Sequence, residues 1–569
     1  MGFLDVLKVK DSSTVQTDNW KSPDVICLPP SRRTWGHMDF LGFWNVIALS
    51  ISTWQSCGTL LSLGLNVWQS MVVVIIAKAI IFAIALSHGW GGAVWHIGYP
   101  IYGRFTFGMY GSFLALIQRI VLCIVWYAVQ SYTGAQLIAI MLSCIFSSYN
   151  NLHNTLPDSL PMTLKQFVGF VIYHVISIPF LYIPPESFHT PFKVITIIAF
   201  LAVFGTSIGS MVHAHGAGEL LHSKSTAKPG ADLGMAWMHG INAVINTFAV
   251  GLANQPDFSR FASKPGKQIW GQAVSILVFG TIVPLFGILG TSAASHSYGD
   301  VGALNLWNPP NIIEQWLLES YTPRSRCAAF FASFGFFIST LGLNTIDNGV
   351  SGGIDLAAIA PKWINIRRGT YIIMIISIVI QPWQILANAT VFVSVLSSYG
   401  CFLGPMIGTF TADYFIVRHQ KLKLTDLYTA DSTSIYWFWH GINWRGIVSW
   451  VCGFVPGIIG FPSVNPANTN VPTAAIKMFY ISFIIGYPIS FIVHVILNTL
   501  FPPPGIGEID EYDHFQTFTP DEARKLGVTP HESASAYVDD SEGHWNTDSM
   551  EKVETVGLRH RLKDTLRSE

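Results

Sequence analysis

The sequence predicts an all-α polytopic membrane protein, and its composition and its apolar runs both support this fold class. Of its 569 residues, 50% are hydrophobic and only 11% are charged, whereas a soluble protein carries about 25% charged residues. The mean hydropathy is +0.43, and the apolar residues gather in runs of about 17–30 residues, the length of a membrane-spanning helix. Twelve such runs predict twelve transmembrane helices, at residues 40–62, 66–88, 112–146, 166–184, 191–212, 234–254, 271–293, 327–347, 371–388, 390–416, 445–462 and 473–501.

The composition also excludes several classes of protein. The net charge is −1, which gives no indication of a nucleic-acid partner. The seven cysteines have neither the spacing of a disulfide framework nor that of a metal site. No Walker-type glycine loop indicates ATP-driven chemistry, and no nucleophile–base pair is visible. We therefore expect no enzyme, no cofactor and no metal.

The charges of the connecting loops predict the orientation and the domain boundaries. Lys and Arg are more frequent in the loops that face the cytosol when the N-terminus is placed inside, as the positive-inside rule requires. We expect a cytosolic N-terminal tail at 1–37, a twelve-helix membrane domain at 38–501 and a cytosolic, mostly disordered tail at 502–569, which lacks apolar periodicity. Lys525, Lys552 and Lys563 are candidate sites for ubiquitination, although a solvated tail without a specific role explains them equally well.

The third segment carries the first candidate site. Trp126 and Gln130 are four residues apart, so they share one face of a helix. An aromatic plane beside an amide can hold a flat, neutral, hydrogen-bonding ring. The alternative is that both residues only pack against neighbouring helices.

The first and sixth segments contain polar residues and glycines where a membrane helix is normally uniform. Residues 44–58 include Trp54 and Gln55 and predict a broken helix that lines a cavity; an intact helix with polar packing residues is the alternative. The sixth segment, with its asparagines and Gly251, is the candidate counterpart of the first in an inverted repeat. At its end, Asp257 and Arg260 are three residues apart and predict a local ion pair.

The eighth segment ends in Asn344, Asp347 and Asn348, and the two asparagines share a helix face. Amides and a carboxyl near mid-span are unfavourable unless they serve a cavity. Lys78, in the middle of the second segment, is either a functional group or a structural partner of Asp347. Both are candidate coupling residues.

The tenth segment predicts a bending helix with gating residues. Tyr399 is placed to close over a ligand or to pack, and Phe402 and Leu403 precede a Gly-Pro pair. Histidine is the usual proton switch near neutral pH. However, five histidines lie at or beyond the segment ends: His88, His96, His213, His215 and His222. No histidine is therefore assigned as the proton carrier.

Residues 30–500 contain an ordered series of motifs: Arg33-Thr34-Trp35, Thr53-Trp54-Gln55, Leu63 to Gln69, Tyr99-Pro100, Arg104 to Gly111, Trp126 to Gln130, Pro256 to Arg260, Asn344 to Asn348, and Gly404-Pro405 to Gly408 with Asp413-Tyr414. In these motifs and their order the chain resembles the nucleobase–cation symporter family 1, and within it the fungal uracil/allantoin permease-like branch.

The resemblance implies a five-plus-five inverted repeat with two extra C-terminal helices and transport by alternating access. It implies that Trp126 stacks on a heterocycle and that Gln130 bonds its amide edge. By position it adds Gln55, Asn348 and the gate aromatic Tyr399. The expected function is import of uracil, allantoin or a similar ring across the plasma membrane.

One departure from the family concerns the coupling ion. Gly342 and Leu343 stand where sodium-coupled relatives have hydroxyl side chains, so this chain offers no side-chain oxygen there for a hard cation. We therefore expect proton symport. The alternatives are a thiamine, nicotinamide riboside or uridine importer on the same scaffold, and a non-transporting nutrient sensor.

Overall fold

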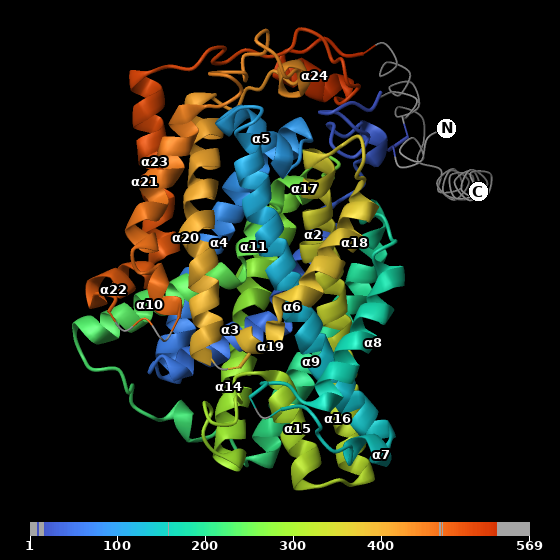
Figure 1. Cartoon of the computed structure of the whole chain (residues 1–569), viewed down its shortest axis with the longest axis vertical. Helices are drawn as coiled ribbons and strands as arrows, with labels where there is room; N and C mark the ends of the chain where they lie inside the picture. Colours follow the sequence, from blue (N-terminus) through green and yellow to red (C-terminus); the bar gives the residue numbers. More distant parts are fainter. Residues whose placement is uncertain are drawn as a thin grey trace, which may run out of the picture. The chain divides into compact units, whose positions relative to one another are not determined.

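The computed structural model describes residues 8–10, 16–157, 159–387, 389–465, 468 and 470–531 (Figure 1). Within these residues the chain is helical and contains no strand; extended backbone pairs only at three isolated bridges, such as that between Trp35 and Ala262. The all-α prediction is therefore confirmed for the described part of the chain.

Seven of the twelve predicted segments coincide with helices that are long and apolar enough to cross a membrane. They are α4 (Val67–Trp95), α6 (Ser112–Ile145), α9 (His189–His213), the run α13 (Lys267–Ala273), η4 (Val274–Phe279) and α14 (Gly280–Tyr298), the run α16 (Pro323–Leu343), η5 (Asn344–Val350) and α17 (Ser351–Ile359), the run α20 (Ala389–Ala412) and η7 (Asp413–Val417), and α23 (Ser482–Leu500). Since α4 continues to Trp95, the prediction that the second segment ends at His88 is wrong: His88 is buried inside the helix and stacks on Phe410.

The other five segments fall on helices that are shorter or interrupted. The first is split into α2 (His37–Ala48) and α3 (Ile51–Ser62), and the sixth into α10 (Ala231–Thr247), α11 (Ala249–Ala253) and α12 (Gln255–Ser259). The remaining three are α8 (Leu164–Phe180), α18 (Ile366–Ser377) and α21 (Trp444–Ile458). Between the long helices lie α5 (Tyr99–Phe107), α15 (Pro309–Glu319) and α22 (Thr473–Tyr480).

Residues Met1–Ile509 form one compact unit, and helix α6 lies in its interior. It packs against α8 and α16, α16 packs in turn against α9, and α20 packs against α23 (Figure 1). Most side chains of α6 are buried, whereas α9 leaves Leu201 and Val212 exposed by 65% and 68%. Such exposed apolar side chains are expected where a helix meets lipid.

A second unit begins at Asp510. Its helix α24 (Pro520–Leu526) starts with a capping box, in which Thr519 and Glu522 satisfy each other's backbone N–H groups. The Asp513 carboxylate accepts hydrogen bonds from the backbone of Thr517 and Phe518. The predicted tail thus contains an ordered segment, while residues 532–569, with Lys552 and Lys563, lie outside the described residues.

Candidate functional site at two helix breaks

A small internal cavity lies where the two interrupted helices meet α6 and η5. Its volume is about 10 Å³, roughly the room of one water molecule. It is lined by Ile47, Ser50, Ser52, Trp126, Gln130, Thr247, Val250, Leu343, Asp347 and Asn348. The structure is therefore closed around this site, and a heterocycle can enter only when these side chains move apart.

The first break separates α2 from α3. Helix α2 ends at Ala48, Ser50 is extended with ψ 156°, and α3 begins at Ile51. The Ser50 hydroxyl accepts a hydrogen bond from the Thr53 backbone N–H at 3.3 Å, and the Thr53 hydroxyl donates to the Ile47 carbonyl at 3.1 Å. These side chains satisfy the backbone groups that the break exposes. The prediction of a broken first helix is confirmed, and the intact alternative is wrong.

The second break separates α10 from α11 at Phe248. Its neighbours Thr247 and Val250 line the same cavity as Ile47 and Ser50 of the first break. Irregular backbone at membrane depth persists only where it is buried in protein or lines a cavity, and both conditions are met here.

Trp126 and Gln130 lie on the same face of α6 and both line the cavity. The Gln130 amide nitrogen donates to the Ser52 hydroxyl at 2.6 Å. Within the described residues, neither the Trp126 Nε1 nor the Gln130 Oε1 has a hydrogen-bond partner. The cavity therefore offers one donor and one acceptor that the protein itself does not use. The Trp126 ring meets Phe392 of α20 edge to face, with centroids 6.4 Å apart.

Asn344, Asp347 and Asn348 lie in η5, a π-helical stretch inside an otherwise α-helical run. Such bulges occur frequently at functional sites because they re-aim side chains. The predicted shared face is confirmed, since the Asn348 amide donates to the Asn344 Oδ1 at 2.9 Å. Asn344 does not line the cavity; its amide nitrogen donates to Ser131 and to the Tyr173 hydroxyl. It thereby orients Asn348, which does line the cavity.

The first-segment residues Trp54 and Gln55 lie outside the cavity lining. The Trp54 Nε1 donates to the Thr291 hydroxyl at 3.1 Å, and the Gln55 amide donates to the Asn308 Oδ1 at 2.9 Å. In this closed arrangement both residues connect α3 to later segments of the chain, so the structure does not bring them together with Trp126 and Gln130.

The tenth-segment residues are also away from the cavity. Tyr399 is half-buried and is not part of its lining. Phe402 packs against Trp450 and Phe454 of α21, and Leu403 is buried beside it. The aromatic residue of α20 that does approach Trp126 is Phe392, which also stacks on Trp307 with centroids 5.4 Å apart.

A buried ionic cluster adjoins the cavity through Asp347, and no local sequence pattern indicates it. Arg119 of α6 forms ion pairs with Asp257 of α12 and with Asp355 of α17, both at 2.5 Å. Its guanidinium also donates to the Asn254 Oδ1 at 3.2 Å, and the Asn254 amide donates to the Asp347 carboxylate at 2.9 Å. We call Arg119, Asn254, Asp257, Asp347 and Asp355 the Arg119 network. It links the cavity lining to three helices.

The predicted ion pair between Asp257 and Arg260 is wrong, and so is the alternative in which Lys78 is the structural partner of Asp347. The Asp257 carboxylate is bound by Arg119, whereas the Arg260 Nε donates to the Asp257 backbone carbonyl. None of the ion pairs between described residues joins Lys78 to Asp347. Instead, the Lys78 Nζ lies 3.2 Å from the centroid of the Phe248 ring, at the second helix break, and it has no hydrogen-bond partner among the described residues.

The loop after α4 ties the N-terminal segment to the end of α12. Arg33 donates to the His96 Nε2, and the His96 Nδ1 lies 3.2 Å from the Arg260 carbonyl oxygen. A guanidinium can only donate and a carbonyl can only accept, so His96 is neutral with its proton on Nδ1. Burial, and next the Arg33 charge, hold the pKa of His96 well below its usual value.

Comparison with known proteins identifies a family and a shared fold. The model of a family described as permease for cytosine/purines, uracil, thiamine, allantoin matches residues 27–486. The chain is 39% identical to the transporter aclS of Aspergillus oryzae, over 94% of this chain and 95% of that protein. It is 35% identical to the allantoin permease of Saccharomyces cerevisiae, over 85% and 76% of the two chains. Among solved structures, MHP1, a nucleobase-cation-symport-1 family transporter in a closed conformation with bromovinylhydantoin bound, shares the fold with a TM-score of 0.65 at 17% identity, covering 89% of this chain and 99% of that one.

Proposed function

Because the chain belongs to the family of permeases for cytosine/purines, uracil, thiamine and allantoin, we propose that it imports uracil, allantoin or a similar neutral ring by proton symport. The observation that carries this proposal is the pair of unused polar atoms in the cavity, the Trp126 Nε1 and the Gln130 Oε1. A ring bearing imide or urea groups presents N–H donors and carbonyl acceptors along one edge, which is what these two atoms and Asn348 can bind.

The proposed binding mode is stacking on Trp126 with the polar edge of the ring towards Gln130 and Asn348. The gain from each hydrogen bond is modest, but a wrong ligand leaves a buried amide unpaired, at a cost of about 1–3 kcal/mol. Asn344 supports this face by accepting the hydrogen bond of Asn348. Trp54 and Gln55, which bond Thr291 and Asn308 in the closed structure, would reach the substrate only after α3 moves. The selectivity of the transporter then comes from the amides and its affinity largely from the aromatic surface.

The proposed transport cycle is alternating access on a twelve-helix fold with a five-plus-five inverted repeat and two extra C-terminal helices. The two helix breaks, at Ser50 and at Phe248, are the proposed counterparts in the two repeats. Since Tyr399, Phe402 and Leu403 lie off the cavity when it is closed, their gating role requires a movement of α20.

Proton coupling is supported by the charge count of the Arg119 network. Two carboxylates contact the one guanidinium, and the third, Asp347, is joined to it through Asn254. This buried surplus of negative charge is reduced when one carboxyl takes up a proton. Asp347 is the member that also lines the cavity, so we propose it as the coupling residue. Lys78 is the second candidate.

A cationic substrate such as thiamine or nicotinamide riboside is the second candidate, and the Asp347 carboxylate in the cavity lining favours it. Uridine import and a non-transporting sensor role are further alternatives. We also propose a plasma-membrane location, with cytosolic tails at 1–37 and 502–569 that are open to the trafficking or ubiquitination machinery.

The test is uptake of radiolabelled uracil, allantoin, uridine and thiamine into cells that lack their own carriers, at pH 5 and pH 7, with and without sodium. Trp126→Ala is compared with Trp68→Ala, because Trp68 is 59% exposed and lies outside the cavity. We expect uptake of one neutral ring, stronger at pH 5, independent of sodium and lost only in Trp126→Ala. Preferred uptake of thiamine would instead support the alternative of a cationic substrate.

A further inference from the structure

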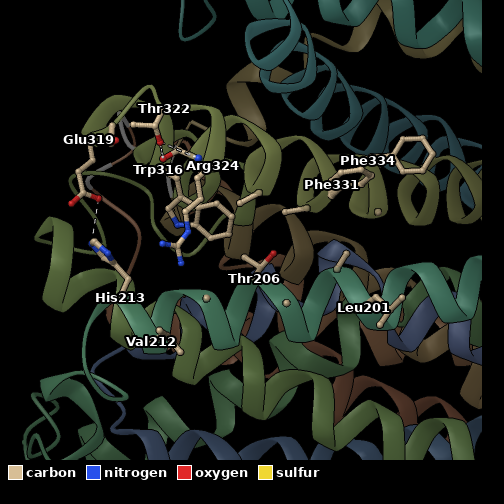
Figure 2. Close-up of a pocket in the computed structure, with 18 of the residues that line it drawn as sticks. Leu201, Thr206, Val212, His213, Trp316, Glu319, Thr322, Arg324, Phe331 and Phe334 are labelled. Atoms are coloured by element: carbon tan, nitrogen blue, oxygen red, sulfur yellow. Dashed lines mark hydrogen bonds and ion pairs between the residues drawn. The ribbon is translucent and has the colours of Figure 1, made fainter.

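A second cavity of about 960 Å³ lies between α9 and α16 and shares no lining residue with the substrate cavity (Figure 2). Most of its wall is apolar, and Figure 2 shows Leu201 of α9 facing Phe331 and Phe334 of α16. Leu201, Val212 and Phe331 are each exposed by 65% or more. The cavity is therefore an open groove on the surface of two spanning helices, where the surroundings are lipid.

One end of the groove is polar and carries both signs of charge. Glu319 of α15 pairs with His213 at 3.2 Å and accepts a hydrogen bond from the Tyr298 hydroxyl at 3.1 Å. Arg324 lines the same end next to Trp316 (Figure 2). In the described part of the chain, Arg324 has no ion-pair partner, so its charge is available to a ligand.

We propose that this groove binds a phospholipid with a zwitterionic headgroup. The phosphate lies on the Arg324 guanidinium, which suits phosphate oxygens in charge and in shape. The ammonium group lies against Glu319 and the rings of Trp316 and Tyr298, because quaternary ammonium ions bind aromatic faces. The acyl chains fill the apolar part of the groove.

The length of the groove fits one leaflet. From Arg324 to Gly335 along α16 there are eleven residues, about 16 Å of helix, or about half of a hydrocarbon core roughly 30 Å thick. The polar end therefore lies at headgroup level when the apolar end lies near the bilayer centre. This match requires only that α9 and α16 span the membrane and does not depend on the substrate.

Two glycines keep the groove open. A Cβ added at Gly205 meets no atom within 4 Å, and one at Gly209 touches only the Trp316 ring at 3.9 Å. Since a larger side chain at Gly205 projects into open space, it fills the groove without a backbone clash. Ile197, also on α9, is 63% exposed but does not line the groove, which makes it a matched control.

The experiment is native mass spectrometry of the purified full chain with added dioleoylphosphatidylcholine, and in parallel with dioleoylglycerol, which lacks the headgroup. We expect the wild-type protein to retain one phosphatidylcholine per chain and to retain dioleoylglycerol about tenfold less, the effect of roughly 1.4 kcal/mol. We expect Gly205→Trp and Arg324→Gln each to lower phosphatidylcholine retention about tenfold, and Ile197→Trp to leave it unchanged.

Three outcomes would overturn the proposal. Equal retention of both lipids by the wild-type protein would exclude headgroup recognition. Equal losses in Gly205→Trp and Ile197→Trp would show that the retained lipid is not in this groove. If the wild-type protein is a dimer in the same spectra, its change to a monomer in Gly205→Trp, without a change in lipid retention, would show that the groove holds a second copy of the chain.

Discussion

Replacing Gln130 with Leu tests the substrate site most directly, because its amide has two separable roles. Its nitrogen is already bound to Ser52, whereas its Oε1 has no partner in the closed structure. A ligand N–H that reaches this oxygen therefore gains a hydrogen bond without breaking one inside the protein. In Gln130→Leu the same N–H is buried without an acceptor, which costs about 1–3 kcal/mol, or a roughly 5–150-fold loss of affinity.

The assay is the inhibition constant of the unlabelled substrate against its own labelled uptake, in cells with matched surface levels of each variant. Gln136→Leu is the control, since Gln136 lies six residues further along α6, about 9 Å away, and its Oε1 accepts from Asn308 rather than facing the cavity. We expect a change of less than about twofold there. An unchanged inhibition constant in Gln130→Leu, or an equal weakening of binding in both variants, would contradict the proposed hydrogen bond from the ligand to the Gln130 Oε1.

Four further predictions concern the buried charges. Arg119→Gln leaves two carboxylates without their cation, at a cost of about 3–5 kcal/mol. The melting temperature should therefore fall sharply, and it should recover in part when Asp355→Asn is added. A melting temperature close to wild type in the single variant would contradict this. Lys78→Met removes a buried ammonium without an acceptor and keeps the volume, so the melting temperature should rise, and a lost pH 5 to pH 7 uptake ratio in this stable variant would assign coupling to Lys78. The folded-state pKa of His96 is depressed, so the contribution of His96 to stability is complete above about pH 6.5 and is lost as the pH falls below that value. His96→Gln should therefore reduce the loss of melting temperature between pH 7 and pH 5. An identical dependence of melting temperature on pH in the variant and the wild type would refute the assignment of a neutral His96. Asn254→Leu cuts the link from Asp347 to Arg119 without replacing a residue of the cavity lining, so substrate binding should persist while uptake falls. Parallel losses of both would show that Asn254 acts on the site itself.

The parts of the fold that the sequence predicts are those set by local patterns. Hydropathy locates the spanning segments because apolar length is a direct requirement of the bilayer. The polar run around Ser50 predicts the first helix break, since only a cavity or protein contacts tolerate it. The four-residue spacing of Trp126 and Gln130 predicts their shared face, and the structure agrees because α6 is regular there.

The features that the sequence does not predict depend on contacts between residues that are far apart in the chain. The three-residue spacing of Asp257 and Arg260 favours a local pair, but Arg119, 138 positions away, offers a better-placed guanidinium. The sequence also does not indicate which face of α20 is directed towards Trp126, because α20 carries apolar side chains both on the side towards α6 and on the side towards α21. As a result, the sequence predicts Tyr399 and Phe402 near the ligand, whereas the aromatic residue of α20 in contact with Trp126 is Phe392.

The position of the Arg119 network explains how an event in a cavity the size of one water can reach the far end of the helices. Asp347 lines the cavity and is held by Asn254, which is also held by Arg119. Arg119 in turn fixes α12 and α17 to α6 through Asp257 and Asp355. A proton on Asp257 or Asp355 removes one charge from this set and weakens the hold of the single guanidinium, whereas a proton on Asp347 weakens the hydrogen bond that it accepts from Asn254. In the proposed symport, substrate at the cavity and a proton on this network would act on connected hydrogen bonds, which gives the two sites a physical route for a coupling free energy.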